Sequence, residues 1–364
     1  MWIVGFSILV GILYLVLISI FYFGWNRIPI FISTDNDNLN TMVSVIVPCR
    51  NEEDNISQLI QSLSKQTYPN FEVIIVNDHS EDATRTYIET TQSELSKFHL
   101  IDALGFGKKN ALREGILKST GDLIVSTDAD CFHPNNWLQT IVSFQKNHSC
   151  DLVICPVKIQ SNNSLFSKLQ ELEFTSLVAS GAGASGAGMP ILCNGANLVF
   201  TKKVWLKSQA NLHEEEQSGD DMFLLENVKK QGGKIRFLKS ESAFANTKGS
   251  DSLMEFITQR RRWTSKSAAY SDWQIIFTAI IVLLVNLLSI ILLSLSFFNL
   301  NYLILFFTLF VFRYLLDSIF LSSVGPFFKL KNIWIYSLIL SVIYPFYIVF
   351  VVLSSFIVKP GTWR

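Results

Sequence analysis

The chain has 364 residues, 49% of them hydrophobic, and its 30 basic side chains balance its 30 acidic ones. This length accommodates one large soluble domain together with membrane-spanning segments, and the zero net charge gives no indication of nucleic acid as a partner. The five cysteines form no Cys-x-x-Cys pair, which fits a reducing compartment better than a disulfide framework.

Residues 3–23, near the N-terminus, are almost wholly apolar. Their length approaches what a bilayer requires, no basic segment precedes them, and no Ala-x-Ala-like cleavage site follows them. We therefore expect an uncleaved membrane anchor over residues 1–24. A polar linker is expected over residues 25–41.

Three further apolar segments lie in the last third of the chain. Membrane spans are expected at about 275–297, 302–324 and 333–358. They form a membrane region over residues 273–358, which is followed by a short tail, 359–364.

Charged residues and a proline add detail to these spans. The basic residues beside them, Arg27 and Lys329 among others, predict by the positive-inside rule that the middle of the chain is cytoplasmic. Pro345 leaves open a re-entrant last segment. Arg313 and Asp317, four residues apart in one span, are interpreted as a structural pair, with binding of an acceptor's polar group as the alternative.

Strand and helix patterns alternate between residues 42 and 250. This order predicts an α/β domain with a parallel, doubly wound sheet, whose ligand lies at the carboxyl ends of the strands. Strands are expected at 43–48, 71–76, 98–101 and 123–130, with helices between them at 55–66, 82–95 and up to residue 119. The polar residues expected at the carboxyl ends are Asn51, Glu52, Asp78, Lys108, Asp128 and Asp130.

Asp128 and Asp130 end the fourth predicted strand. If that strand remains extended, the two carboxylates point the same way, because side chains repeat with period two. Such a pair favours Mg²⁺ or Mn²⁺, which in nucleotide enzymes also takes phosphate oxygens. The alternative is a polar turn in which Asp130 caps the helix that begins near Pro134.

The other polar residues also have structural interpretations. Asn51 could cap its helix, Asp78 could be an ordinary turn residue, and Lys108 could lie on the surface. In a functional interpretation, Asp78 accepts a hydrogen bond from a base or a ribose. Lys108, beside a Gly-x-Gly turn, would suit a diphosphate.

Small residues and acids mark the second half of the domain. Residues 180–188 are all Gly, Ala or Ser and are expected to form a mobile gating loop. The small residues of 193–197 would let a sugar approach the backbone. Asp220 and Asp221 open a predicted helix, where the helix dipole favours acids regardless of function. The functional alternative makes Asp221 a general base for an acceptor hydroxyl.

A basic amphipathic helix is predicted within residues 251–272, directly before the first C-terminal span, so we expect it to lie at the membrane surface. Gln259, Arg262 and Trp263 share one face at positions i, i+3 and i+4. Arg260 and the arginine that follows it point elsewhere and are expected to contact anionic lipid.

In this order the motifs resemble those of the membrane-bound family 2 glycosyltransferases, inverting enzymes with the nucleotide-sugar fold called GT-A. The cellulose and hyaluronan synthases share the set. The resemblance covers residues 43–263. The matching elements are Pro48-Cys49-Arg50-Asn51-Glu52, Asn77-Asp78, Asp128-Ala129-Asp130, Gly219-Asp220-Asp221 and Gln259-Arg260-Arg261-Arg262-Trp263.

The resemblance implies roles for these positions. Asp130, together with Asp128, would hold the metal on the donor diphosphate, and Asp221 would be the catalytic base. Asp220 stands where the family more often has glutamate. The donor side would also include Asn51, Glu52, Asp78, Lys108 and Asp128, and the acceptor and diphosphate side would include Gln259, Arg262, Trp263 and Asp220.

The function that the resemblance implies is that of a metal-dependent hexosyltransferase in the inner cell membrane, with its GT-A domain (42–250) in the cytoplasm. It would move a sugar from a nucleoside-diphosphate donor, expected to be a UDP-sugar, to a lipid-linked or membrane-proximal glycan acceptor. One alternative is a processive polysaccharide synthase that extrudes its product. Another is an inactive membrane module that binds nucleotide-sugars.

Overall fold

The computed structural model describes residues 2–33, 40–209 and 219–357. The expected tail, 359–364, and part of the expected linker lie outside these residues. The chain divides into two compact units, and each is described by itself. Of the described residues, the helical unit comprises 2–27, 161–191 and 249–357, and the sheet unit comprises 28–33, 40–160, 192–209 and 219–248.

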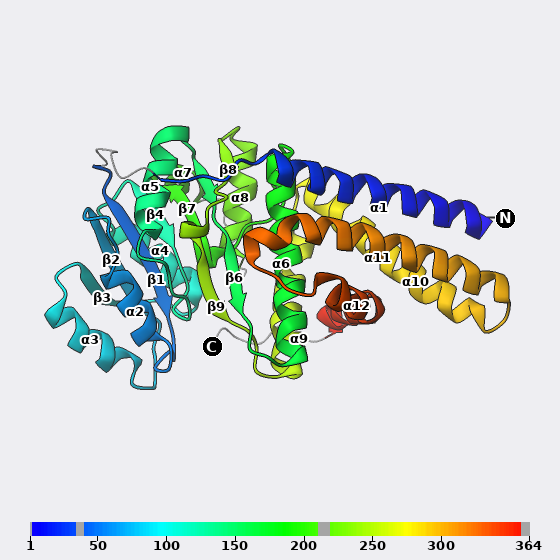
Figure 1. The fold of residues 1–364 in the computed structure, drawn as a ribbon. Helices are drawn as coiled ribbons and strands as arrows, with labels where there is room; N and C mark the ends of the chain where they lie inside the picture. The colour runs from blue at the N-terminus through cyan, green and yellow to red at the C-terminus, as the bar shows by residue number, and fades with distance from the viewer. Residues whose placement is uncertain (1, 34–39, 210–218, 358–364) are drawn as a thin grey trace. The chain divides into compact units, whose positions relative to one another are not determined.

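The sheet unit is built on a seven-stranded sheet with the order β3-β2-β1-β4-β7-β5-β8 (Figure 1). The first four strands are parallel, as the alternating pattern predicts. Their order reverses between β1 and β4, which is where ligands of doubly wound sheets bind. The bounds are β1 Val43–Cys49, β2 Phe71–Asn77, β3 Phe98–Asp102, β4 Leu123–Ser126, β5 Leu152–Ile154, β7 Leu198–Thr201 and β8 Ile235–Phe237.

Helices cover both faces of this sheet, because successive side chains of a strand point to opposite faces. Val45 belongs to the core cluster that contains Ile56 of α2 and Trp137 of α5. Ile46 points the other way, and α4 lies so close to it that a Cβ on Gly115 would come within 2.6 Å of its side chain. The bounds are α2 Ile56–Ser64, α3 Thr84–Glu94, α4 Lys108–Lys118, α5 Trp137–His148, α7 Lys202–Ser208 and α8 Asp220–Lys230.

The second half of the sheet departs from the expected parallel arrangement. Strand β7 runs antiparallel to both β4 and β5. A proline at position 156 separates β5 from β6 (Val157–Gln160), which pairs instead with β9 (Ala245–Lys248) in a small parallel sheet. Proline cannot donate to a strand ladder, so the chain changes sheets at this point.

Among the described residues, the helical unit holds four helices that are long and apolar enough to cross a membrane, as many as the spans that the sequence predicts. They are α1 Trp2–Arg27, α10 Trp273–Ser296, α11 Leu300–Phe328 and α12 Ile333–Ile357. The same unit contains α6 (Leu165–Gly186), α9 (Leu253–Thr264) and the short η4 (Ser265–Ala269). Helix α12 continues through Pro345. In Figure 1, α12 is seen nearly end-on, whereas α1 and α11 are seen along their length.

The expected gating loop over residues 180–188 is wrong, because α6 continues as a helix to Gly186. Its small residues allow a close approach to α1. A Cβ on Gly183 would lie 2.3 Å from the carbonyl oxygen of Phe21, and one on Gly24 would lie 1.9 Å from that of Gly183. Small residues at membrane helix interfaces permit this kind of backbone contact. The run of glycines is therefore a packing surface.

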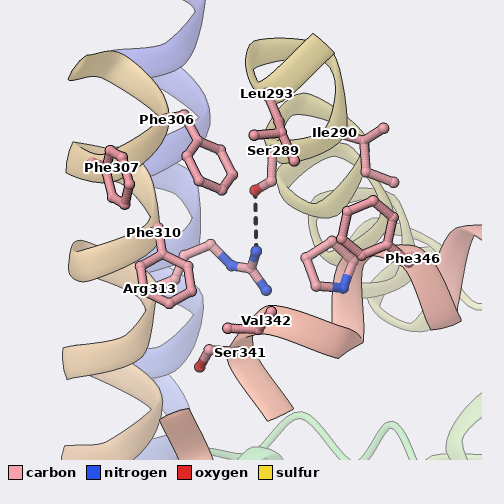
Figure 2. A pocket seen from close by; sticks show the side chains of 11 residues that line it. Ser289, Ile290, Leu293, Phe306, Phe307, Phe310, Arg313, Ser341, Val342 and Phe346 are labelled. Atoms are coloured by element: carbon pink, nitrogen blue, oxygen red, sulfur yellow. Dashed lines mark hydrogen bonds between the residues drawn. The ribbon is translucent and has the colours of Figure 1, made fainter. Parts of the chain in front are cut away.

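Arg313 and Asp317 do not hydrogen-bond each other among the described contacts, and each of them hydrogen-bonds side chains of another helix. Arg313 donates to Ser289 Oγ at 3.1 Å (Figure 2) and to Asn286 Oδ1 at 2.9 Å, both on α10. Asp317 accepts from Tyr14 OH of α1 at 2.5 Å. The expected structural pair therefore has no direct hydrogen bond: each partner links α11 to a neighbouring helix, while the charge of Arg313 still acts on Asp317.

Candidate active site

The polar residues predicted at the carboxyl ends of the strands do gather beside β1, β2 and β4 in the sheet unit. Strand β4 ends at Ser126, four residues earlier than expected, and Asp128 begins a turn that its carbonyl closes with the N–H of Cys131 at 3.1 Å. The period-two argument therefore does not apply to the two carboxylates. They nevertheless lie close enough for Asp128 to influence the pKa of Asp130.

Asp128 and Asp130 have different surroundings. Lys108, at the start of α4, donates to Asp128 Oδ1 at 2.5 Å, and both side chains remain partly exposed. Asp130 Oδ2 accepts from Thr247 Oγ1 at 2.9 Å. Burial, and then the charge of Asp128, raise the pKa of Asp130. Two carboxylates whose like charges repel each other in partly desolvated surroundings form a favourable binding site for a cation.

The same two carboxylates fit a divalent metal with phosphate oxygens completing its coordination, since Mg²⁺ is commonly bound by one or two carboxylates and substrate phosphates. Among the described residues, no group of three or more His, Cys, Asp or Glu side chains could hold a metal ion by itself. The ammonium group of Lys108 lies beside Asp128, at a position from which a cation would neutralise the Asp128 carboxylate.

Glu52 is a further carboxylate at this edge of the sheet. Burial raises its pKa to about 7, a hydrogen bond from Asn55 opposes the shift, and the charges of Asp130 and Asp128 add to it. Its Oε2 accepts from Asn55 Nδ2 at 2.8 Å. Glu52 thus belongs electrostatically to the same acidic group as the two aspartates.

Asp78 is fully buried, and its oxygens already have protein partners. Oδ2 accepts from the N–H of Gly107 at 2.8 Å, and Oδ1 lies 3.1 Å from His79 Nδ1. Gly107 has a φ of +93°, which suits glycine. His79 stacks on Phe106 with ring centroids 4.1 Å apart. Asp78 therefore fixes the loop that leads into α4, and its predicted contact with the donor remains a prediction.

Asn51 does not cap α2. Its Oδ1 accepts from the N–H of Glu81 at 2.9 Å, and its own N–H donates to Ser80 Oγ at 3.1 Å. These bonds join the loops that follow β1 and β2. Asn51 has a φ of +52°, which asparagine tolerates better than most residues.

Asp220 and Asp221 begin α8 and face different partners. Asp220 lies 3.6 Å from Lys109 Nζ of α4. Asp221 Oδ2 accepts from the N–H of Gly195 at 3.0 Å, and the carbonyl of Gly195 accepts from Ser126 Oγ at 2.8 Å. Asp221 is thereby tied through one residue to the end of β4, although 95 positions separate Asp221 from Ser126 in the chain.

Gln259, Arg262 and Trp263 lie on α9, in the helical unit. The expectation that Arg260 contacts lipid is wrong: the residue is 4% exposed, and its side chain forms a two-bond ion pair with Glu173 of α6, at 3.1 and 2.5 Å. Its guanidinium lies 4.2 Å from the Trp263 ring centroid and donates to Gln259 Oε1 at 2.7 Å. Burial lowers the pKa of Arg260, but the charge and hydrogen bonds of Glu173 outweigh this and raise it.

Sequence reasoning missed Thr247 and Glu173. A threonine in a short strand gives no local signal. Glu173 does give one, because it is a carboxylate between Leu172 and Phe174, which are both buried. A charge within the apolar face of a helix indicates a buried partner.

Residues 44–206 match the family model described as "Glycosyl transferase family 2". The chain therefore carries a family 2 glycosyltransferase domain, accompanied by four apolar helices. Its fold is that of the GT-A glycosyltransferases. A mannosyltransferase from Pyrobaculum calidifontis, solved in complex with GDP-Man and Mn²⁺, superimposes with a TM-score of 0.54 at 15% identity, over 93% of this chain and 96% of that one.

Two curated relatives are named as a polysaccharide synthase and as a lipid-phosphate sugar transferase. A poly-beta-1,6-N-acetyl-D-glucosamine synthase from Staphylococcus epidermidis is 27% identical over 172 residues, which are 46% of this chain and 41% of the relative. An undecaprenyl-phosphate 4-deoxy-4-formamido-L-arabinose transferase from Pectobacterium carotovorum is 28% identical over 151 residues, 40% of this chain and 45% of the relative. The chain spans less than half the length of these curated relatives.

Proposed function

We propose that this protein transfers a sugar, with inversion, from a nucleoside-diphosphate donor to a lipid-linked or membrane-proximal glycan acceptor. The observation that carries the proposal is the link from Asp221 through Gly195 to Ser126 at the end of β4. It brings the proposed base to the strand end that is followed by Asp128 and Asp130. A UDP-sugar is the expected donor.

Each group then has a chemical task. Asp128 and Asp130 would hold a divalent cation, which supplies charge stabilisation for the leaving diphosphate. Lys108 is placed to add a second positive charge there. Asp221, whose Oδ2 is oriented by the N–H of Gly195, would remove the proton from the attacking hydroxyl. Gln259, Arg262 and Trp263 are proposed to contribute to acceptor and diphosphate binding.

A second candidate is a processive polysaccharide synthase, which is favoured by the similarity to the poly-N-acetylglucosamine synthase. Product length separates the two, because single addition lengthens an acceptor by one sugar. An inactive nucleotide-sugar-binding module would release no nucleoside diphosphate at all.

The test uses the full chain in lipid nanodiscs with radiolabelled nucleotide-sugars and Mn²⁺ or Mg²⁺. We expect Asp221→Asn to lower kcat by about 10²–10⁴-fold, as is typical for loss of a general base, with little change in donor affinity. Chelation of the metal should stop nucleoside-diphosphate release, and added metal should restore it.

Asp54→Asn is the matched control, because Asp54 is an exposed acid of the same unit. Near wild-type turnover of Asp221→Asn at saturating donor would show that another residue is the base. Activity that survives complete chelation would remove the metal role from Asp128 and Asp130.

A further inference from the structure

The first turn of α4 carries two adjacent lysines that contact different parts of the candidate site. Consecutive residues of a helix point about 100° apart, so the side chains of Lys108 and Lys109 diverge. Lys108 contacts Asp128, and Lys109 Nζ lies 3.6 Å from Asp220 Oδ1. Lys109 Nζ is also 5.7 Å from the ring centroid of Phe223 on α8. The start of α4 therefore contacts both the proposed cation site and the helix that carries the proposed base.

The loop before α4 and the sheet beneath it fix the direction of Lys109. Gly107, the residue before the helix, has a φ of +93° and donates its N–H to the buried carboxylate of Asp78 at 2.8 Å. The helix then lies against the sheet, since a Cβ on Gly115 would come within 2.6 Å of the Ile46 side chain. A helix that is held at its start and along its length gives its first side chains a defined direction.

The start of α8 lacks the hydrogen bond with which a capping side chain holds the first turn of many helices, because its N-cap is Gly219. Asp221 is attached to the N–H of Gly195, and Asp220 provides a second attachment through Lys109. The side chains of Asp220 and Lys109 are each 14% exposed. Largely buried charges are unfavourable when their partner is removed, so without Lys109 the Asp220 carboxylate would turn toward solvent and displace the first turn of α8.

We propose that Lys109 is a positioning residue for the transfer reaction. Its ion pair with Asp220 holds the first turn of α8, and thereby holds Asp221 in the orientation that receives the proton of the attacking hydroxyl. Lys109 acts through Asp220 and does not contact the donor. This inference rests on the proposed function, because it assigns Lys109 a task in that reaction.

The alternative is that Lys109 binds the donor diphosphate, as a lysine at the start of a helix can. The largely buried ion pair with Asp220 favours positioning. The two assignments also differ in their kinetics. Loss of a residue that orients the base lowers kcat and leaves the donor KM nearly unchanged, whereas loss of a diphosphate ligand raises the donor KM.

The first test follows hydrogen–deuterium exchange of the full chain in nanodiscs without any substrate, in peptides that cover residues 219–225. We expect Lys109→Met and Asp220→Asn each to speed exchange there by about tenfold, because the first turn of α8 opens more often. In the Asp220→Asn background, Lys109→Met should not speed exchange further, since the partner through which Lys109 acts is already lost.

The second test measures sugar transfer at varied donor concentration. We expect Lys109→Met to lower kcat by about 10–10²-fold through misplacement of the base, with the donor KM within about threefold of wild type. Lys109→Arg keeps the positive charge and should recover most of the kcat. Lys118→Met is the matched control, because Lys118 is an exposed lysine in the last turn of the same helix, and it should leave both measurements unchanged.

Wild-type exchange over residues 219–225 in Lys109→Met would overturn the proposal. So would a raised donor KM with unchanged kcat, which would make Lys109 a diphosphate ligand, and so would faster exchange throughout the sheet unit, which would make the ion pair a support of the whole fold. The exchange measurement does not depend on transfer. If the wild-type chain transfers no sugar, the proposed function fails together with the task of Lys109 in it, while the exchange data still report whether Lys109 holds α8.

Discussion

At the scale of single residues, the candidate site contains acids in contrasting surroundings. Asp221 accepts two backbone N–H bonds, from Gly195 and Met222, which fix its orientation. Glu52 instead lies near Asp128 and Asp130, and burial together with these like charges raises its pKa to about 7. A carboxyl group in such a place is neutral below that pH and becomes an unfavourable buried charge above it.

This predicts a pH dependence of stability from Glu52. Its pKa is about 7 in the folded state against an ordinary 4.5, so between these values the folded protein holds a proton that the unfolded chain has released. The free energy of unfolding therefore falls as the pH rises from about 4.5 to about 7, by about 2 kcal/mol after allowance for partial exposure.

Glu52→Gln removes this ionisation. Without added metal, we expect the variant to be about 2 kcal/mol more stable than wild type at pH 8 and about equal at pH 4.5. Chemical denaturation of the purified protein at both pH values measures the difference. The exposed Glu81→Gln is the control. An equal gain at both pH values would contradict a titration-based effect.

At the scale of elements, two helices of the helical unit pack differently from what the sequence predicts. The small residues of α6 pack its backbone against α1. Helix α9 is anchored to α6 by the ion pair between Arg260 and Glu173, whose side chains are 5% and 4% exposed. Because Arg260 also contacts Gln259 and Trp263, Glu173 orients the conspicuous motif of α9 through Arg260.

Glu173→Gln is expected to lower the free energy of unfolding by about 3–5 kcal/mol, because it leaves a buried guanidinium without its counter-charge. Thermal or chemical unfolding of the full chain in micelles measures this. Replacing both partners, Glu173→Leu with Arg260→Met, should recover much of the loss. Wild-type stability of the single variant would mean that Arg260 finds another anion.

At the scale of the whole molecule, the four apolar helices among the described residues and their flanking charges predict a membrane topology. Phe298 lies in the uncharged connection between α10 and α11, and Lys331 lies in the basic connection between α11 and α12. The positive-inside rule predicts that the second connection lies in the cytoplasm. The catalytic domain is proposed to lie on that side.

Cysteine labelling tests this topology with little background, because all five native cysteines are buried. In sealed right-side-out vesicles, a membrane-impermeant maleimide should label Phe298→Cys directly. It should label Lys331→Cys only after permeabilisation. The reverse pattern would place the catalytic domain outside.

The sequence by itself determined most of the helices and strands. Hydrophobic periodicity gave β1 to β4 within one or two residues at most ends, and apolar length gave the four spans, because both signals are local. The ordered motifs likewise indicated a GT-A glycosyltransferase, because residue types and their order are properties of the chain alone. The end of β4 was predicted too late in the chain, because acidic residues at that place are compatible both with a turn and with an extended strand.

Only the tertiary structure decided which residues meet. The antiparallel course of β7, the helical state of residues 180–186 and the burial of Arg260 depend on partners far away in the chain, and no local pattern encodes those partners. The same holds for the link from Asp221 to Ser126 and for the ion pair between Lys109 and Asp220. Long-range contacts decide between two locally acceptable structures, since burial and hydrogen bonding with distant segments outweigh local propensity.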